Sequence, residues 1–209
     1  MMENDKAIEA LTDIRSMMER SSKFISLNGL TGVFAGIFAL VGAAVAYFYS
    51  AKIFGPDFIF DNLKAGQKTD ILTFYSIDAL LVLTLSVGFG IWLSKRKSRK
   101  TGQSVLDKTA VRMLENLAIP LLTGGIFCIA LLWHGIIGLI APAMLIFYGL
   151  SLINASKYTI GDTRYLGYME VVLGLTCCFF IGYGLLFWAV GFGVFHIAYG
   201  IFMYYSIEK

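Results

Sequence analysis

Few side chains in the apolar stretches of this 209-residue chain could carry out chemistry. Asp78 and His196 lie within long apolar runs, and His134 lies at the end of another. Carboxyl and imidazole groups bind and release protons, and they are costly to bury in an apolar medium. Together with Tyr183, these residues could converge in one cavity in the outer leaflet that serves as a proton or small-solute site. The alternative is that water, backbone groups or lipid headgroups satisfy each of them separately.

The two histidines also permit cofactor chemistry. Imidazole is a common axial ligand of haem iron, so His134 and His196 on separate helices could bracket one porphyrin. Two is the minimum for such a site, and the chain has only two histidines. Apart from this alternative, we expect no cofactor.

The sequence predicts neither catalysis nor a metal site. It lacks HExxH, GxSxG and a phosphate-binding glycine loop followed by lysine. Cys128, Cys177 and Cys178 are odd in number and lie in apolar runs, so we interpret them as small packing residues rather than disulfide partners. The class that fits is a non-enzymatic protein.

The elements that carry these residues are membrane helices by composition. Hydrophobic residues make up 57% of the chain and charged residues 15%, whereas a soluble domain carries about 25% charge. A membrane helix needs about 20 mostly apolar residues, and continuous runs favour helices over barrel strands. We therefore predict an all-α integral membrane protein. Six segments qualify as spans: about 27–50, 71–94, 117–133, 136–154, 166–188 and 190–207.

The distribution of lysine and arginine predicts the orientation. The segment before the first span has four, the second loop seven, the fourth loop two and the tail one, so fourteen fall on one side and three on the other. Both termini should be cytoplasmic. A basic cluster in the second loop could also touch anionic lipid headgroups. It comprises Lys95, Arg96, Lys97, Arg99 and Lys100. A net charge of +3 predicts no nucleic-acid partner.

The first 26 residues are mostly polar and do not read as a cleavable signal peptide. Ile8, Leu11, Met17 and Met18 recur at near-helical spacing among charged residues. We expect residues 1–26 to form a cytoplasmic amphipathic helix that lies on the membrane, packs on the helix ends or binds a protein partner. Residues 27–209 then form the six-helix membrane domain.

The spans share a glycine pattern that predicts three copies of one helical hairpin, at about 27–94, 117–154 and 166–207. The odd spans each show a glycine, a small residue three positions on and a second glycine ten positions on. These sets begin at Gly32, Gly125 and Gly174. The even spans each place a glycine after an aromatic residue, at Gly90, Gly149 and Gly200.

Small residues let membrane helices approach closely, because association in lipid depends on packing rather than on the hydrophobic effect. Gly32 and Gly36 also form a GxxxG step. We expect all of these glycines to mark helix–helix contacts.

The segment from Gly135 to Pro142, GIIGLIAP, and the Tyr148-Gly149-Leu150 that follows resemble the repeat of the HdeD-type acid-resistance membrane proteins of bacteria. The resemblance would cover about residues 27–205 and implies six spans and, at most, a role in envelope stress. The other two copies lack a proline equivalent to Pro142. The basic second loop is not a family feature, and no catalytic residue carries over.

We therefore expect a multi-pass protein of a cell membrane, of the bacterial inner membrane by this resemblance. It would assist envelope stress tolerance or regulate a partner, with lipids, a second copy or a cytoplasmic protein as its partners. A channel or carrier using the Asp78 region is the alternative, and a haem electron carrier is a third. We expect Glu115 and Glu170 to lie at the membrane interface.

Overall fold

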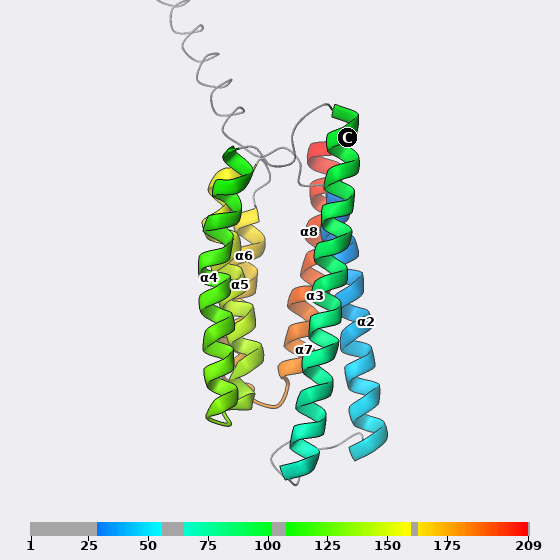
Figure 1. Ribbon diagram of the computed structural model, residues 1–209, viewed down its shortest axis with the longest axis vertical. Coiled ribbons are helices and arrows are strands. Elements are labelled where there is room, and N and C mark those ends of the chain that lie inside the picture. The colour runs from blue at the N-terminus through cyan, green and yellow to red at the C-terminus, as the bar shows by residue number, and fades with distance from the viewer. Residues whose placement is uncertain (1–28, 56–64, 102–107, 160–162, 209) are drawn as a thin grey trace, which may run out of the picture.

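The computed structural model describes residues 29–55, 65–101, 108–159 and 163–208 (Figure 1). The predicted helix over residues 1–26 lies outside them. The described residues are helical apart from short turns. The elements are α2 (Gly29–Phe54), α3 (Ala65–Thr101), α4 (Lys108–Trp133), η2 (Ile137–Leu139), α5 (Ile140–Ala155), η3 (Ser156–Tyr158), α6 (Thr163–Cys177), α7 (Gly184–Trp188), η4 (Ala189–Phe195), α8 (His196–Met203) and η5 (Tyr204–Glu208).

Five of the described helices are long and apolar enough to cross a membrane, which agrees with a multi-pass membrane protein. They are Gly29–Ile53, Gly66–Arg96, Lys108–Trp133, Ile137–Tyr158 and Gly184–Ser206. Large apolar side chains cover their outer faces, as lipid contact requires: Leu122 is 66% exposed and Ile126 69%. The helix α6 has 15 residues and is not among the five.

The predicted boundary between the fifth and sixth spans is wrong. The helix α6 ends at Cys177 and α7 begins at Gly184, whereas the spans were predicted as 166–188 and 190–207. The turn itself is apolar, so hydropathy does not fall where the chain reverses. Gly182 has a φ of 106°, in the left-handed region that glycine tolerates. The predicted break near Ala189 lies instead inside one helical column, which runs from α7 through η4, α8 and η5.

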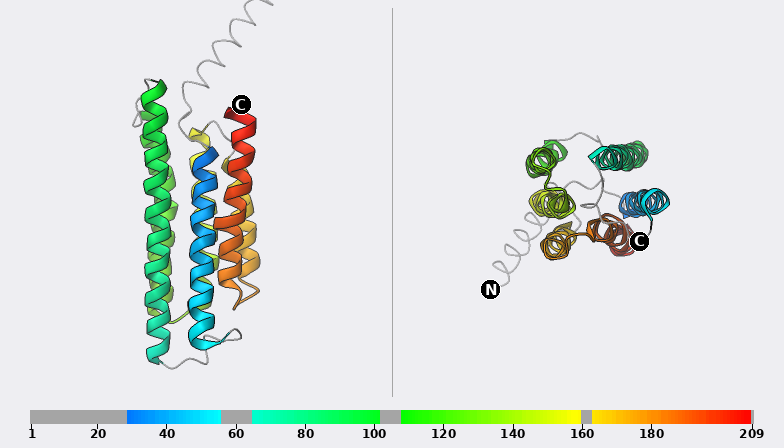
Figure 2. Two further views of the ribbon diagram at one scale, coloured as in Figure 1. Left: turned by 90° about the vertical axis from the view of Figure 1, so that its right-hand side faces the viewer. Right: turned by 90° about the horizontal axis from the view of Figure 1, so that it is seen from below.

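The helices stand side by side in a curved row. Neighbour contacts give the order α4, α5, α6, the α7–η5 column, α2 and α3, and Figure 2 shows this curve in the view along the helices. The consecutive helices α3 and α4 form the two ends of the row. We call the end of the bundle where α2 begins and η5 ends the termini end, and the opposite end the turn end (Figure 2).

Glycines bring two pairs of helices into backbone contact. A Cβ built at Gly149 of α5 would lie 2.6 Å from the carbonyl oxygen of Gly167 of α6. A Cβ at Gly32 of α2 would lie 3.3 Å from the Cα of Gly200 of α8. Of the other glycines predicted at helix contacts, those whose Cβ would meet a neighbour within 3.0 Å are Gly36, Gly90 and Gly174.

Gly125 does not fit this prediction. A Cβ there would meet nothing within 4 Å among the described residues, whereas one at Gly124 would collide with the ring of Phe147 on α5. Successive helical residues point about 100° apart, so the preceding glycine occupies the packing face and Gly125 faces outward. The threefold repeat stays a prediction. The glycines ten positions after the first in each copy differ in their local structure. Gly42 lies within the helix α2, whereas Gly135 lies in a turn with a φ of 73°.

Candidate functional site

A carboxyl group lies in the middle of the bundle. Glu170 is the eighth residue of α6, and its exposed fraction is 0%. It faces Gly191 of η4, whose missing side chain leaves room for it: a Cβ at Gly191 would lie 2.5 Å from Oε2 of Glu170. The expectation that Glu170 lies at the membrane interface is therefore wrong. The predicted span begins at residue 166 and ends at residue 188, so Glu170 would lie near its start. The helix α6 instead begins at Thr163 and ends at Cys177, and Glu170 is its middle residue.

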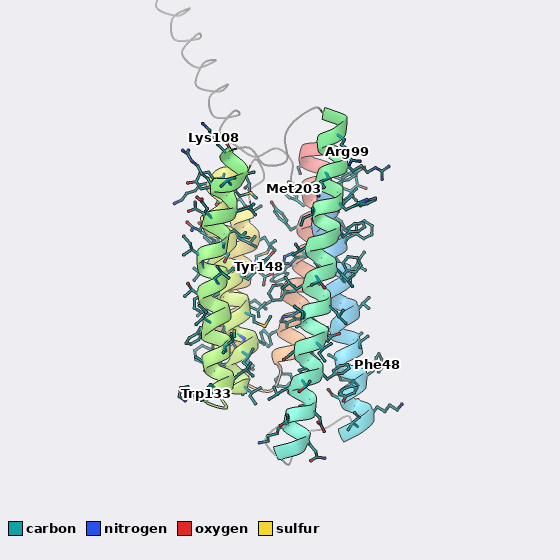
Figure 3. All side chains as sticks on the ribbon, in the orientation of Figure 1. Phe48, Arg99, Lys108, Trp133, Tyr148 and Met203 are labelled. Carbon is teal, nitrogen blue, oxygen red and sulfur yellow. The ribbon has the colours of Figure 1, made fainter. Side chains whose placement is uncertain are left out.

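His196 approaches this carboxyl from α8. Its Nδ1 lies 3.5 Å from Oε1 of Glu170 and 3.0 Å from the carbonyl oxygen of Gly191. Its Nε2 lies 2.7 Å from the hydroxyl oxygen of Tyr148 on α5. A neutral imidazole donates through one nitrogen and accepts through the other. The carbonyl can only accept, so Nδ1–H donates to Gly191 and the Tyr148 hydroxyl donates to Nε2. Figure 3 shows Tyr148 at mid-height, between the two groups of helices.

The Glu170 carboxyl lies within ion-pair distance of His196 but makes no hydrogen bond among the described residues. Neither Oε1 nor Oε2 has a hydrogen-bond partner among the described residues. An ionisable group buried in a membrane interior in this way is costly, and such groups commonly serve a function. Glu170 and His196 can share a proton as carboxylic acid and imidazole, or as carboxylate and imidazolium. Both arrangements carry no net charge, so the pair can hold one proton without burying an isolated ion.

The local helix geometry is irregular at this site. The segment η4, Ala189–Phe195, is π-helical and ends directly before His196. Short π-helical segments inside α-helices are rare and occur frequently at functional sites. Here the segment contains Gly191, which both accepts a hydrogen bond from His196 and accommodates Glu170.

Aromatic rings continue from His196 towards the turn end. Phe192 stacks on the imidazole with centroids 5.9 Å apart and planes at 22°. The centroid of the Phe192 ring also lies 5.0 Å from that of Tyr148 and 5.2 Å from that of Trp188. These three aromatic side chains pack around one side of the site.

The structure does not bring the four predicted polar residues together. His196 is buried against Glu170, His134 is exposed in the turn after α4, and Tyr183 is 61% exposed in the turn before α7. Asp78 lies on α3, facing α2. The single outer cavity proposed from the sequence is therefore not formed. The two histidines also have different settings, and both nitrogens of His196 already have partners, which does not suit axial haem ligation.

Asp78 belongs to a second polar cluster, between α2 and α3. Its Oδ2 would lie 3.2 Å from a Cβ at Gly42, so this carboxylate also rests against a glycine. Nearby, the hydroxyls of Ser50 and Tyr75 lie 2.8 Å apart, and Ser50 also donates to the carbonyl of Ala46. Unlike Glu170, Asp78 is only half-buried.

The basic cluster extends α3 as helix instead of forming a loop. Lys95, Arg96 and Arg99 are exposed there, and the Arg96 guanidinium lies 5.7 Å from the centre of the Trp92 ring. Figure 3 shows Arg99 near the termini end. Lys97 and Lys100 lie on the same helical turns, but their side chains are not described. Cationic side chains at a helix end suit contact with lipid headgroups.

The chain matches no protein-family model, no curated protein and no solved structure. Within the described residues, no group of three histidine, cysteine, aspartate or glutamate side chains could hold a metal ion.

Proposed function

We propose that this chain is a non-enzymatic membrane protein that binds and releases a proton at Glu170 and His196, and that the packing of its helices depends on that proton. One observation carries the proposal: the Glu170 carboxyl is fully buried, lacks a hydrogen-bond partner among the described residues and lies 3.5 Å from Nδ1 of His196.

Burial favours a proton over a larger ligand. The exposed fraction of Glu170 is 0%, and the position opposite its carboxyl at Gly191 is also closed by Leu145 and Leu173. An organic solute could enter only if the helices moved apart, whereas a proton needs no added volume. The occupant that this arrangement favours is therefore a proton.

A proton at this site would bias helix packing. Losing it leaves a net negative charge in an apolar interior, and gaining a second leaves a net positive charge. The site lies where α5 and α6 meet the α7–η5 column, because Tyr148, Glu170 and His196 come from those three elements. Either change would weaken this contact or draw in water.

The proposal includes a six-span topology with three hairpins and both termini in the cytoplasm. The antiparallel packing of α6 against α5 supports a sixth crossing, and the apolar turn after α6 would extend its short length within the bilayer. The exposed cations Lys95, Arg96, Arg99, Lys108 and Arg112 belong to α3 and α4 at the termini end, which supports a cytoplasmic location.

A proton-dependent bundle suits a role in tolerance of envelope stress, and of acid stress above all. The resemblance to the HdeD-type proteins supports that role and an inner-membrane location. We propose that the change in packing is transmitted to a cytoplasmic partner through the residues before the first span.

Infrared difference spectroscopy between acidic and neutral buffers tests the proton site. A protonated carboxyl has a C=O stretching band that a carboxylate lacks. We expect a band that disappears in Glu170→Gln and persists in the matched control Asp78→Asn. An unchanged spectrum in Glu170→Gln would refute the proposal.

One observation favours a second candidate, a small-solute carrier at Asp78. This carboxylate is half-buried and rests against Gly42, so water and ions could reach it without separation of the helices. Flux into proteoliposomes that weakens in Asp78→Asn but not in Glu170→Gln would support the carrier.

A further inference from the structure

We infer that α3 and α4, the two ends of the curved row, close against each other and complete the row as a ring. They would meet through a third glycine contact of a kind that the bundle already forms twice. The structure then shows the open form of this edge. Closure does not require the proposed proton site, so either can fail without the other.

The contacts between α5 and α6 and between α8 and α2 are built alike. A Cβ at Gly149 of α5 would lie 2.6 Å from the carbonyl oxygen of Gly167 of α6. A Cβ at Gly200 of α8 would lie 2.6 Å from the carbonyl oxygen of Gly29 of α2. In both pairs the helices run antiparallel, and a tyrosine directly precedes the first of the two glycines.

The match continues two turns farther along both pairs. Seven residues on in α6, a Cβ at Gly174 would lie 3.0 Å from the backbone nitrogen of Ile146. Seven residues on in α2, a Cβ at Gly36 would lie 3.0 Å from the backbone nitrogen of Ile197. Each isoleucine comes three residues before the contact glycine of its own helix. Two different helix pairs therefore pack in the same register through residues at the same spacing.

The helices α3 and α4 carry residues of the same kind at the matching positions. In α4, Ala118 and Gly125 are seven residues apart, like the paired glycines of α6 and α2. In α3, Gly90 follows the aromatic Phe89, and the β-branched Val87 lies three residues before Gly90. The two helices also run antiparallel (Figure 1). The register of the formed contacts predicts that Val87 meets Gly125.

The glycine face of α4 is turned towards the open side of the row. In α6, which runs in the same direction, Leu173 lies against Gly191 of the α7–η5 column and the next residue, Gly174, packs on the opposite neighbour, α5. In α4, Gly124 packs on α5, so the next residue, Gly125, faces the other side, where α3 lies (Figure 2). A Cβ at Gly125 would meet nothing within 4 Å among the described residues.

The matching face of α3 is uncovered as well. Phe89 packs on Phe34 of α2, with ring centroids 4.5 Å apart, and Gly90 lies at the edge of this contact. Among the described residues, a Cβ at Gly90 would meet a single atom within 4 Å, Cγ2 of Thr31. Val87 is 51% exposed. Buried residues make up 17% of the most apolar stretch of α3 and 11% of that of α4, against 33% in α2.

The partner that suits each face is the other face. A helix face with small residues gains packing in lipid when a second helix covers it closely. Residues 102–107 alone separate α3 from α4 in the sequence, so each helix has the other at a high effective concentration. A second copy of the chain has no such advantage.

The seam opposite the open edge can provide the movement. The two formed glycine contacts lie within the groups α4–α5–α6 and α3–α2–column, whereas side chains join the groups to each other, at Tyr148 with His196 and at Glu170 against Gly191 (Figure 1). The π-helical segment η4 lies on this seam. Packed helices that meet through side chains can slide or rotate by small amounts, which opens or closes a distant edge.

Disulfide formation in the full chain, reconstituted in lipid vesicles, tests closure. The three native cysteines are replaced by alanine, and Val87→Cys is combined with Gly125→Cys and treated with copper phenanthroline as oxidant. A disulfide needs Cβ atoms about 3.8 Å apart, whereas in the open form no described atom of α3 lies within 4 Å of a Cβ at Gly125. The control pair is Leu85→Cys with Gly125→Cys, because Leu85 is 54% exposed but is turned about 160° from Val87.

We expect a disulfide within one chain that forms about tenfold faster in the Val87 pair than in the control pair, since only Val87 would face α4 on closure. A disulfide that links two chains would refute closure and assign the two faces to contact between copies. Equal rates in the two cysteine pairs would refute it as well.

A second measurement leaves both faces free. Spin labels at Leu85→Cys and Ile126→Cys report the separation of α3 from α4 by double electron–electron resonance. Packed helices lie about 8–10 Å apart between their axes, so closure should add a second, shorter separation. Gly125→Leu should abolish it, whereas Gly88→Leu, also in open space but turned about 160° from Gly90, should keep it.

A single separation that is the same with and without Gly125→Leu would refute closure. The open form does not use this contact, so Gly125→Leu should leave unfolding in detergent nearly unchanged, and loss of the shorter separation then reports on closure rather than on misfolding. The infrared test of Glu170 decides the proton site independently.

Discussion

A methyl group at Gly191 should disturb the buried carboxyl directly. In Gly191→Ala, the new Cβ would lie 2.5 Å from Oε2 of Glu170 and 2.5 Å from Cδ2 of Leu145. Ordinary contacts at such a position are 3.4–4 Å, so each neighbour must withdraw by about 1 Å. Overpacking of this kind costs about 1–3 kcal/mol, and we expect the free energy of unfolding to fall by about 2 kcal/mol.

A double-mutant cycle separates the two collisions. In a Glu170→Ala background the carboxyl is gone and only the contact with Leu145 remains, so Gly191→Ala should cost about 1 kcal/mol less. The assay is unfolding in detergent, followed by fluorescence or circular dichroism. Gly125→Ala is the matched control, because a Cβ there meets nothing within 4 Å, and it should be neutral or slightly stabilising. An equal cost of Gly191→Ala in both backgrounds would refute the placement of Glu170 over Gly191.

Three further substitutions test the packing, each by unfolding in detergent. Tyr148→Phe leaves Nε2 of His196 without its partner and should cost about 1–3 kcal/mol; wild-type stability would contradict this hydrogen bond. Gly149→Leu should separate α5 from α6 and cost about 3 kcal/mol or more, whereas Gly125→Leu should be tolerated, and the reverse order would show that the wrong glycine faces the neighbouring helix. Ser50→Ala removes the hydroxyl that joins α2 to α3 and should cost about 1 kcal/mol; a stabilising effect would show that this bond is not formed.

The helical class, and several glycines that lie at helix contacts, could be predicted from the sequence because they depend on local features. Continuous apolar runs indicate helices wherever they occur, and glycine in a membrane helix indicates close approach. Gly149 and Gly200 illustrate this. Gly125 shows the limit, since glycine content does not tell which face of a helix meets its neighbour. The turn before Gly184 was missed because it is as apolar as the helices it joins.

The buried site was missed for a different reason. Glu170 and His196 are far apart in the sequence, and their meeting depends on where α6 ends and α7 begins. If the fifth span ends near residue 188, Glu170 lies close to the start of that span and therefore to the membrane–water interface. One signal was available: between Arg164 and Ser206, Glu170 is the only charged residue and His196 the only imidazole. A lone carboxyl and a lone imidazole in one apolar hairpin could have been paired from composition alone.

The contact between α2 and α8 constrains how the protein is made. Gly32 and Gly200 meet between two neighbouring helices of the row, although they lie 168 residues apart in the sequence. During synthesis, the first helix enters the bilayer long before its last partner leaves the ribosome. The glycine face of α2 can therefore make this contact only after α8 has been synthesised. A chain that lacks α8 would leave the glycine face of α2 without the backbone that it contacts in the folded bundle.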